Sequence, residues 1–169
     1  MSAQSHLVRL AQGTGAGPAA LIQLCLYDWV VCAVAGQGED VVRHLSGVIE
    51  NPGPCSVFGG ATYDAPTAAL LNGTMGHALD YDDTHFDHIG HTSAVIMPAV
   101  LAVAQEHMLT ETGRVVEAAL AGSEAAVRAG LWLGRGHYQI GYHQTATAGA
   151  FGATIALARL LRLERVQIN

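Results

Sequence analysis

Apolar side chains in this chain recur at intervals of three and four residues, and this periodicity constrains the fold more than any other feature of the sequence. Such spacing places apolar side chains on one face of an α-helix, whereas a half-buried strand needs strict alternation, which the chain lacks. The sequence therefore predicts an all-α fold of about six helices. The expected helices cover residues 19–36, 39–49, 67–79 and 93–107, a segment from Val116 to Leu131, and residues 147–163.

Capping and breaking residues set the expected ends of these helices. Asp64 stands before Ala65-Pro66, which is the pattern of an N-cap with proline in the first turn. Ser93 has the residue type to cap the helix that follows it. The glycines of Gly134-Arg135-Gly136 are expected to stop the helix before them.

Two segments stand outside this helical pattern. Residues 55–63 are the one stretch that the sequence allows to be extended, although their glycines favour a loop equally. Residues 1–18 mix Ser, Gln, Gly and Thr and are expected to form a flexible leader. The predicted organisation is a leader followed by one helical domain over residues 19–169.

The charge and hydropathy of the chain limit its partners and its location. Eight basic residues, all arginine, face fourteen acidic ones, for a net charge of −6, so a nucleic-acid-binding surface is not expected. The apolar stretch Leu21–Ala35 contains Gln23 and Asp28, and the stretch at 94–104 is too short to span a bilayer, so no membrane segment is predicted. Without a secretory signal pattern at the N-terminus, a cytoplasmic location is the expectation.

Half of the residues are apolar and only 13% are charged, against about 25% in typical soluble domains. Such a composition predicts apolar surface that is buried against something else. The three cysteines, Cys25, Cys32 and Cys55, form no Cys-x-x-Cys pair, which argues against a zinc or iron–sulfur cofactor. We expect them to be buried free thiols.

The polar chemistry of the chain is concentrated in residues 77–91, which hold four of its nine histidines and four of its fourteen carboxylates. Three interpretations are open on physical grounds. His and Asp together can bind a metal ion, but the window lacks a His-x-x-x-His pair and the spacing specifies no metal. Carboxylates can also orient imidazoles for proton transfer near neutral pH. Alternatively, the carboxylates cap a helix and bind loop amides while the histidines are solvated.

A second candidate loop, residues 141–149, carries His143 beside the start of a helix rich in small residues. Free backbone N–H groups and the positive end of the helix dipole at such a terminus favour an anion, for example a carboxylate. A single loop histidine is a weak signal when it is taken alone.

Three segments in order resemble the MmgE/PrpD family of dehydratases, decarboxylases and epimerases that act on small carboxylic acids. They are NGTMGHALDYDDTH at residues 72–85, HTSAVIMPA at residues 91–99 and YHQTATAGAFGA at residues 142–153. Residues 26–36 are also similar to the first-helix pattern of the family. The resemblance extends over nearly the whole chain from about residue 20.

This resemblance implies a helical domain that, with a second lid domain, encloses a site for a small di- or tricarboxylate in a homodimer. It implies no cofactor and no metal ion. Carried over position by position, it assigns the candidate catalytic residues as Asp80, Thr84, His91 and His143. One histidine would remove a proton beside a carboxylate and another would protonate a leaving hydroxyl, with Asp80 orienting an imidazole and Thr84 binding substrate.

The chain also departs from the family pattern. Thr92 and Gln144 stand where prolines are usual, and Tyr142 replaces phenylalanine, so the loops change shape while the imidazoles stay in place. Family members are more than twice as long, and their returning helices, lid domain and active-site lysine are not represented here. No lysine occurs anywhere in the chain.

The expected function is thus the N-terminal portion of a lyase similar to 2-methylcitrate dehydratase, inactive when it stands alone. Two alternatives remain open within the sequence argument. One is an epimerase or decarboxylase of the same family, since both need similar proton-transfer groups. The other is a non-catalytic helical module, for which the missing half of the site is the motivation.

Overall fold

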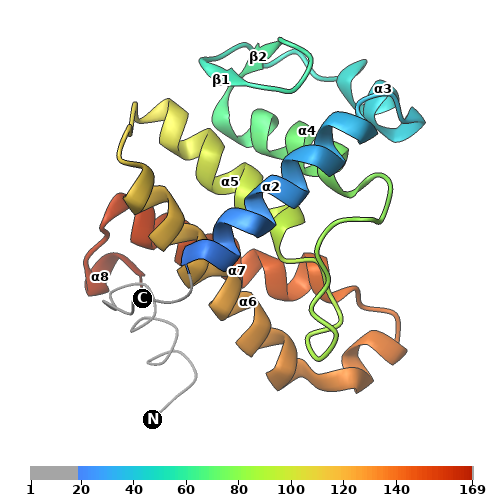
Figure 1. The fold of residues 1–169 in the computed structure, drawn as a ribbon, viewed down its shortest axis with the longest axis vertical. Coiled ribbons are helices and arrows are strands. Elements are labelled where there is room, and N and C mark those ends of the chain that lie inside the picture. The colour runs from blue at the N-terminus through green and yellow to red at the C-terminus, as the bar shows by residue number, and fades with distance from the viewer. Residues whose placement is uncertain (1–18, 169) are drawn as a thin grey trace.

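The computed structural model describes residues 19–168, and the helices and strands in this range form one packed helical domain (Figure 1). The expected leader at residues 1–18 lies outside the described residues. Within residues 19–168, six helices have seven residues or more, and a four-residue helix follows them, so the predicted all-α fold is confirmed. In order, the elements are α2 (Ala19–Gly36), α3 (Asp40–Ser46), β1 (Cys55–Ser56), β2 (Thr62–Tyr63), α4 (Ala65–His77), α5 (Ser93–Glu106), α6 (Thr112–Gln139), α7 (Gln144–Leu161) and α8 (Arg165–Ile168).

The main core lies where α2, α5, α6 and α7 meet. Trp29 of α2, Ile96 of α5 and Leu160 of α7 are fully buried there. A second apolar cluster joins α3, α4 and the small antiparallel pair of β1 and β2, with Leu71 at its centre. Together these clusters hold the helices from which the polar loops of the molecule extend.

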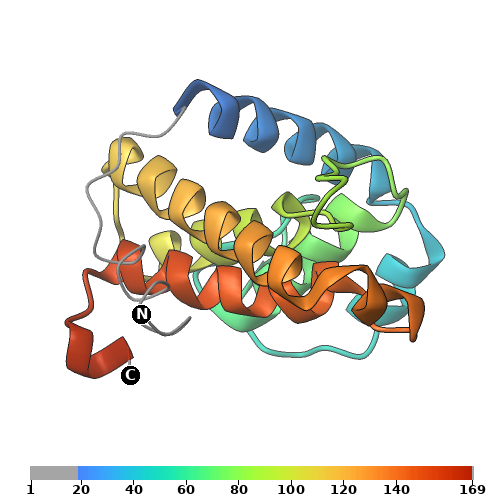
Figure 2. The ribbon, with the colours of Figure 1, turned by 90° about the horizontal axis from the view of Figure 1, so that it is seen from below.

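Helices α6 and α7 run side by side over much of their length (Figure 2). Their contact depends on small residues: a Cβ added at Gly122 would lie 2.6 Å from the Cβ of Ala156 and 2.8 Å from the carbonyl oxygen of Gly152. Small residues on both helices therefore let the two backbones approach closely.

The predicted cap at Asp64 is confirmed, since its Oδ1 accepts a hydrogen bond from the backbone N–H of Thr67, 3.0 Å away. The predicted cap at Ser93 is wrong, because Ser93 lies inside the first turn of α5. Its backbone N–H and its hydroxyl both donate to the carboxylate of Asp83, at 3.1 and 2.8 Å. A carboxylate from the preceding loop thus accepts the hydrogen bonds that the first residue of this helix donates.

The predicted stop at Gly134 is also wrong in part. The helical segment continues to Gln139, and Gly134 forms a kink inside it, with φ 69° and ψ 176°. A positive φ costs glycine little, so the chain turns there without ending the helix. Helix α7 then begins at Gln144, three residues before the expected start, which places His143 at its N-cap position.

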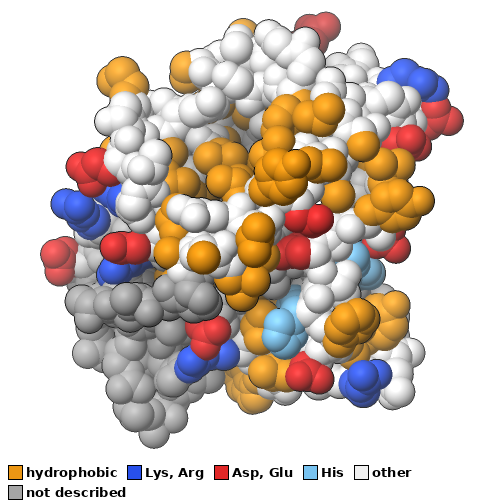
Figure 3. All heavy atoms as spheres, viewed as in Figure 1, with side chains coloured by type: hydrophobic (Ala, Val, Ile, Leu, Met, Phe, Trp, Pro, Cys, Tyr) orange, Lys and Arg blue, Asp and Glu red, His pale blue; other side chains and the backbone are white. Residues whose placement is uncertain are grey.

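Helix α2 is long and apolar enough, by length and composition only, to cross a membrane, with a mean hydropathy of 1.7. One side of it, with Ile22, Trp29 and Ala33, is buried in the core, as in the core helices of many soluble proteins. Its other side is exposed and apolar (Figure 3). The exposed side chains are Leu21, Leu24, Tyr27, Val31 and Val34. The absence of a membrane segment remains a prediction.

The cysteines follow the sequence prediction closely. All three are free; Cys32 and Cys55 are buried and Cys25 is partly buried. Burial raises the pKa of the Cys25 thiol to about 12, with the neighbouring carboxylate of Asp83 acting in the same direction. Such thiols stay protonated at neutral pH and are poor nucleophiles.

Candidate active site

The loop between α4 and α5, residues 78–92, is fixed at its centre by Asp83. The backbone N–H of Asp83 donates to the Asp28 carboxylate of α2 at 2.9 Å, and the Asp83 carboxylate accepts from both the backbone and the hydroxyl of Ser93. Further along, the backbone N–H of His91 donates to the Thr145 hydroxyl of α7 at 3.0 Å. The loop is therefore joined to α2, α5 and α7, and its polar side chains have defined places.

A cluster of imidazoles and carboxylates lies on one side of this loop. We call His77, Asp80, Asp82 and His91 the histidine–aspartate cluster. His77 Nδ1 lies 2.9 Å from Asp82 Oδ1, and the same oxygen is 3.3 Å from His91 Nδ1. His91 Nε2 is 3.4 Å from Asp80 Oδ1. Asp82 is fully buried, whereas the side chain of Asp80 is 77% exposed, so the cluster opens toward solvent at Asp80.

The ring of His91 is oriented by groups around its Nδ1 atom. The carbonyl oxygen of Asp82 lies 3.1 Å from Nδ1, and the Thr84 hydroxyl lies 3.5 Å from it. Nδ1 therefore faces the loop, and Nε2 faces the Asp80 carboxylate. Asp80, whose carboxylate faces Nε2, has a φ of 56°. This is a left-handed backbone conformation that aspartate tolerates better than most residues.

His143 joins the same end of the molecule from the turn between α6 and α7. Its ring centroid is 6.2 Å from that of His77, and the His77 and His91 centroids are 4.7 Å apart. His77 thus stands between the two histidines that the sequence singled out. His77 and His143 also border a cavity of about 680 Å³, lined mainly by apolar residues of α4, α5 and α7.

The electrostatics of the cluster favour a charged imidazole at His77. The hydrogen bond with Asp82 raises the pKa of His77 above its usual value, in opposition to partial burial, and the charges of Asp82 and Asp80 add to the rise. A protonated His77 beside the buried Asp82 is a proton donor held at a fixed place. It can protonate a substrate atom or stabilise negative charge that develops there.

On the other side of the loop, His88 has the opposite environment. Its side chain is fully buried, and neither ring nitrogen has a hydrogen-bond partner among the described residues. Burial lowers the pKa of His88 to about 4, and the nearby His85 and His91 act in the same direction. We call His88, the adjacent Gly130 of α6 and Gln144 of α7 the sealed pocket, and its histidine is neutral at physiological pH.

Gln144 links this sealed pocket to the turn that carries His143. Its Nε2 donates to the carbonyl oxygen of Gly134, the kink residue of α6, at 2.9 Å. Its Oε1 is buried and has no hydrogen-bond partner in the part of the chain that the structure describes. A Cβ added at Gly130 would lie 2.6 Å from this oxygen. The glutamine at a position where the family usually has proline therefore ties together the two helices that meet beside His143.

The four residues predicted from the sequence lie at one end of the domain. Asp80, Thr84 and His91 share the loop between α4 and α5, and His143 approaches from α7. Their catalytic roles stay predictions. The sequence argument did not single out His77 and Asp82, although both belong to the His- and Asp-rich window. No spacing rule joins them, since His77 ends α4 and Asp82 follows in an irregular loop.

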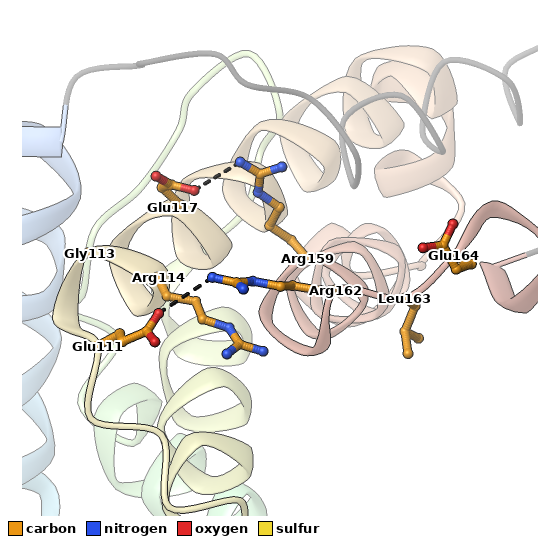
Figure 4. Close-up of a pocket in the computed structure, with 8 residues that line it drawn as sticks. All are labelled: Glu111, Gly113, Arg114, Glu117, Arg159, Arg162, Leu163 and Glu164. Atoms are coloured by element: carbon orange, nitrogen blue, oxygen red, sulfur yellow. Dashed lines mark hydrogen bonds and ion pairs between the residues drawn. The ribbon is translucent and has the colours of Figure 1, made fainter.

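A second cavity, of about 640 Å³, lies at the opposite end of the α6–α7 pair (Figure 4). Its charged side chains are largely paired with one another. Arg159 contacts Glu117 at 2.8 Å, and Arg162 contacts Glu111 at 3.5 Å. Arg114 donates from Nε to the carbonyl oxygen of Leu160 at 2.6 Å. These contacts connect the two helices, and we assign the cavity a structural role.

The fold and the cluster define a class of protein, namely a helical domain that presents histidines and carboxylates together from the turns at one end. The chain belongs to the MmgE/PrpD family, because residues 19–169 match the model of the MmgE/PrpD N-terminal domain. This confirms the resemblance that the sequence motifs indicated.

Curated relatives agree with this assignment. Cis-aconitate decarboxylase from Aspergillus terreus is 32% identical over 150 residues, an alignment that covers 82% of this chain and 30% of that protein. Cis-aconitate decarboxylase-like protein oryM from Aspergillus oryzae is 28% identical over 149 residues, which cover 82% of this chain and 31% of that protein. The chain thus spans less than a third of the length of these relatives.

Proposed function

We propose that this chain is the N-terminal helical part of a lyase that transfers protons on a small di- or tricarboxylate. The observation that supports this most directly is the meeting of His77 and His91 with His143, which is far from them in the sequence, beside Asp80 and the buried Asp82. Proton-transfer lyases need an acid and a base in one site, and two imidazoles in different environments provide both.

The names of the relatives favour decarboxylation as the first reaction to examine. In the loss of carbon dioxide from an allylic carboxylate, the bond to the carboxyl carbon breaks, its electron pair forms a new double bond, and the former alkene carbon accepts a proton. An imidazolium is suited to supply that proton. Dehydration, as by 2-methylcitrate dehydratase, needs a neutral imidazole to take a proton and an imidazolium to protonate the departing hydroxyl.

In this proposal His91 and His143 transfer protons, Asp80 orients the imidazole of His91, and Thr84 binds the substrate. His77, which its contact with Asp82 favours in the charged form, lies between His91 and His143. It helps to stabilise negative charge that develops on the substrate. The cavity beside His77 and His143 gives the site one apolar side. A homodimer and a cytoplasmic location remain part of the proposal.

The test uses the purified chain together with any continuation that its gene encodes. Cis-aconitate and 2-methylcitrate are supplied separately, and products are followed by proton NMR, which distinguishes decarboxylation from dehydration. We expect the double variant His91→Ala/His143→Ala to lose at least 100-fold in kcat/KM, since each general acid or base contributes about 10²–10⁴-fold. The matched control is the double variant His44→Ala/His107→Ala, whose histidines are exposed and lie outside the cluster.

A loss of less than tenfold in the His91 and His143 variant would remove these residues from the chemistry. A folded protein without turnover on either acid would instead favour the alternative, a non-catalytic helical module.

A further inference from the structure

We propose that His77, Asp80, Asp82 and His91 form a reversible binding site for a divalent transition-metal ion of the zinc type. Binding of this ion would occupy His91 and so exclude its proton-transfer role. The binding itself stands apart from the proposed function, whereas its inhibitory consequence rests on it.

The geometry of the cluster suits a four-coordinate ion. One donor atom from each of the four residues lies within 4.8 Å of the other three. Zinc bonds of about 2.0–2.2 Å place tetrahedral ligands about 3.4 Å apart. With Nε2 of His91 as its ligand atom, two contacts between ligand atoms are already present: 2.9 Å from His77 Nδ1 to Asp82 Oδ1, and 3.4 Å from His91 Nε2 to Asp80 Oδ1. Small side-chain rotations would therefore bring four ligands around one ion.

The buried carboxylate of Asp82 provides an independent indication. Its Oδ2 atom is buried and has no hydrogen-bond partner among the described residues, although its Oδ1 atom contacts both histidines. A buried anionic oxygen without a partner is costly, and a bound cation would remove that cost. Metal binding requires deprotonated imidazoles, so the ion would displace the proton of His77. The two carboxylates and two neutral imidazoles then carry a charge of −2, which a divalent ion neutralises.

Among the described residues, the ion pairs of Asp80 and Asp82 are with His77 and His91. The chain contains no lysine. The arginines at the opposite end of the α6–α7 pair are engaged with Glu111 and Glu117, and Arg43 of α3 pairs with Asp40. Asp83 and Asp28 lie beside the cluster and add further negative charge. The local field therefore attracts cations.

The donor types select the kind of ion. Two nitrogens and two oxygens suit zinc and related transition metals, whereas calcium and magnesium require six or more ligands that are nearly all oxygen. The Asp82 carbonyl oxygen and the Thr84 hydroxyl hold His91 by its Nδ1 side, as second-layer contacts do for zinc-binding histidines. The exposed Asp80 leaves a route from solvent to Nε2 of His91.

Titration of the purified chain with cobalt(II) in chelator-free buffer tests the site directly, because tetrahedral cobalt absorbs strongly in the visible range. We expect one ion per chain and displacement of cobalt by zinc. Asp82→Asn and His91→Gln should each weaken binding at least tenfold. Asp87→Asn in the same loop and His107→Gln after α5 are matched controls and should bind as the unmodified chain does. A dispersed ¹H–¹⁵N NMR spectrum verifies that each variant is folded.

Two results would overturn the site: binding well below one ion per chain, or equal affinities in the cluster variants and the controls, which indicates adventitious surface binding. The inhibitory consequence is tested separately once turnover is measured. Zinc should abolish it and a chelator should restore it. If zinc binds as expected but turnover is unchanged, the binding site stands and the proton-transfer role of His91 fails.

Discussion

The two sides of the loop at residues 78–92 place the same type of side chain in opposite environments. In the histidine–aspartate cluster, His77 contacts the buried carboxylate of Asp82 and its pKa is raised. In the sealed pocket, neither ring nitrogen of the buried His88 has a hydrogen-bond partner among the described residues, and its pKa falls to about 4. The neighbouring negative charge raises the pKa of His77, and the loss of hydrating water lowers the pKa of His88. Burial alone therefore does not predict the charge of a histidine in this protein.

The difference also separates two kinds of contribution to the site. The cluster is open to solvent at Asp80 and has groups that can exchange protons with a ligand. The sealed pocket cannot reach a ligand, but it joins the loop to α6 and to the turn that carries His143. The predictions below test this division, beginning with the largest expected effect.

Gly130→Ala should destabilise the domain by about 3 kcal/mol or more. A Cβ at this position would overlap Nδ1 of His88 and lie 2.6 Å from Oε1 of Gln144, and both of these side chains are fully buried. Overpacking of cores typically costs about 1–3 kcal/mol, and here two polar groups are displaced together. The free energy of unfolding in urea measures the effect.

Gly136→Ala in the same helical segment is the matched control. A Cβ there meets nothing within 4 Å, so the substitution should be neutral or stabilise the helix by about 0.5–1 kcal/mol. Equal stabilities of the two variants would contradict the sealed pocket as described.

The second prediction concerns pH. Because His88 has a lower pKa folded than unfolded, the unfolded chain binds an extra proton below about pH 6.5, and the folded state loses stability as the pH falls from there toward 4. The loss attributable to His88 should be about 2–3 kcal/mol at pH 4. In His88→Leu this contribution should vanish.

Unfolding in urea at several pH values gives the comparison. The difference in stability between the unmodified chain and His88→Leu should be constant above pH 7 and should shift in favour of the variant as the pH is lowered. Parallel curves between pH 7 and pH 4 would show that the imidazole is hydrated or paired when folded.

The smallest expected effect is on the titration of His77. Since the hydrogen bond with Asp82 is the main cause of its raised pKa, Asp82→Asn should lower the pKa of His77 toward its usual value. The contribution of this pair to stability has the opposite sign to that of His88. It is present below the unfolded pKa and is lost as the pH rises through the folded value.

NMR titration of the His77 ring protons in chelator-treated samples measures this shift. Asp87→Asn, an exposed change in the same loop, is the control and should leave the titration of His77 unaltered. If Asp82→Asn has no effect, the pKa of His77 is set by groups other than its nearest carboxylate.

Much of the fold could be predicted from local sequence signals. The spacing of apolar residues predicted α2 from Ala19 to Gly36, and Asp64 with Pro66 predicted the start of α4. The errors arose where tertiary contacts replace local ones. Ser93 is held by Asp83 from the loop, and Gly134 bends a helix that it was expected to end.

The candidate site was predictable only in part, for a related reason. The motifs placed His91 and His143 on separate loops, and only the packing of α4, α5 and α7 shows that His77 lies between them. The contacts that Asp82 and Asp83 make also depend on their neighbours in the folded structure. These adjacent residues have the same side chain, yet one faces two imidazoles and the other holds the start of α5. No local pattern distinguishes them.

The hydrogen bond from the Asp83 backbone to Asp28 also has a consequence for the order of folding. It joins residues 55 positions apart, whereas α4 with α5 and α6 with α7 are neighbours in the sequence. Closing longer chain segments costs more entropy, so we expect the neighbouring helix pairs to form first and the loop to dock on α2 late. A partly folded chain would then be mostly helical without having an assembled site. Helical content alone is therefore a poor measure of an intact site, and the backbone amide of Asp83 is a better one.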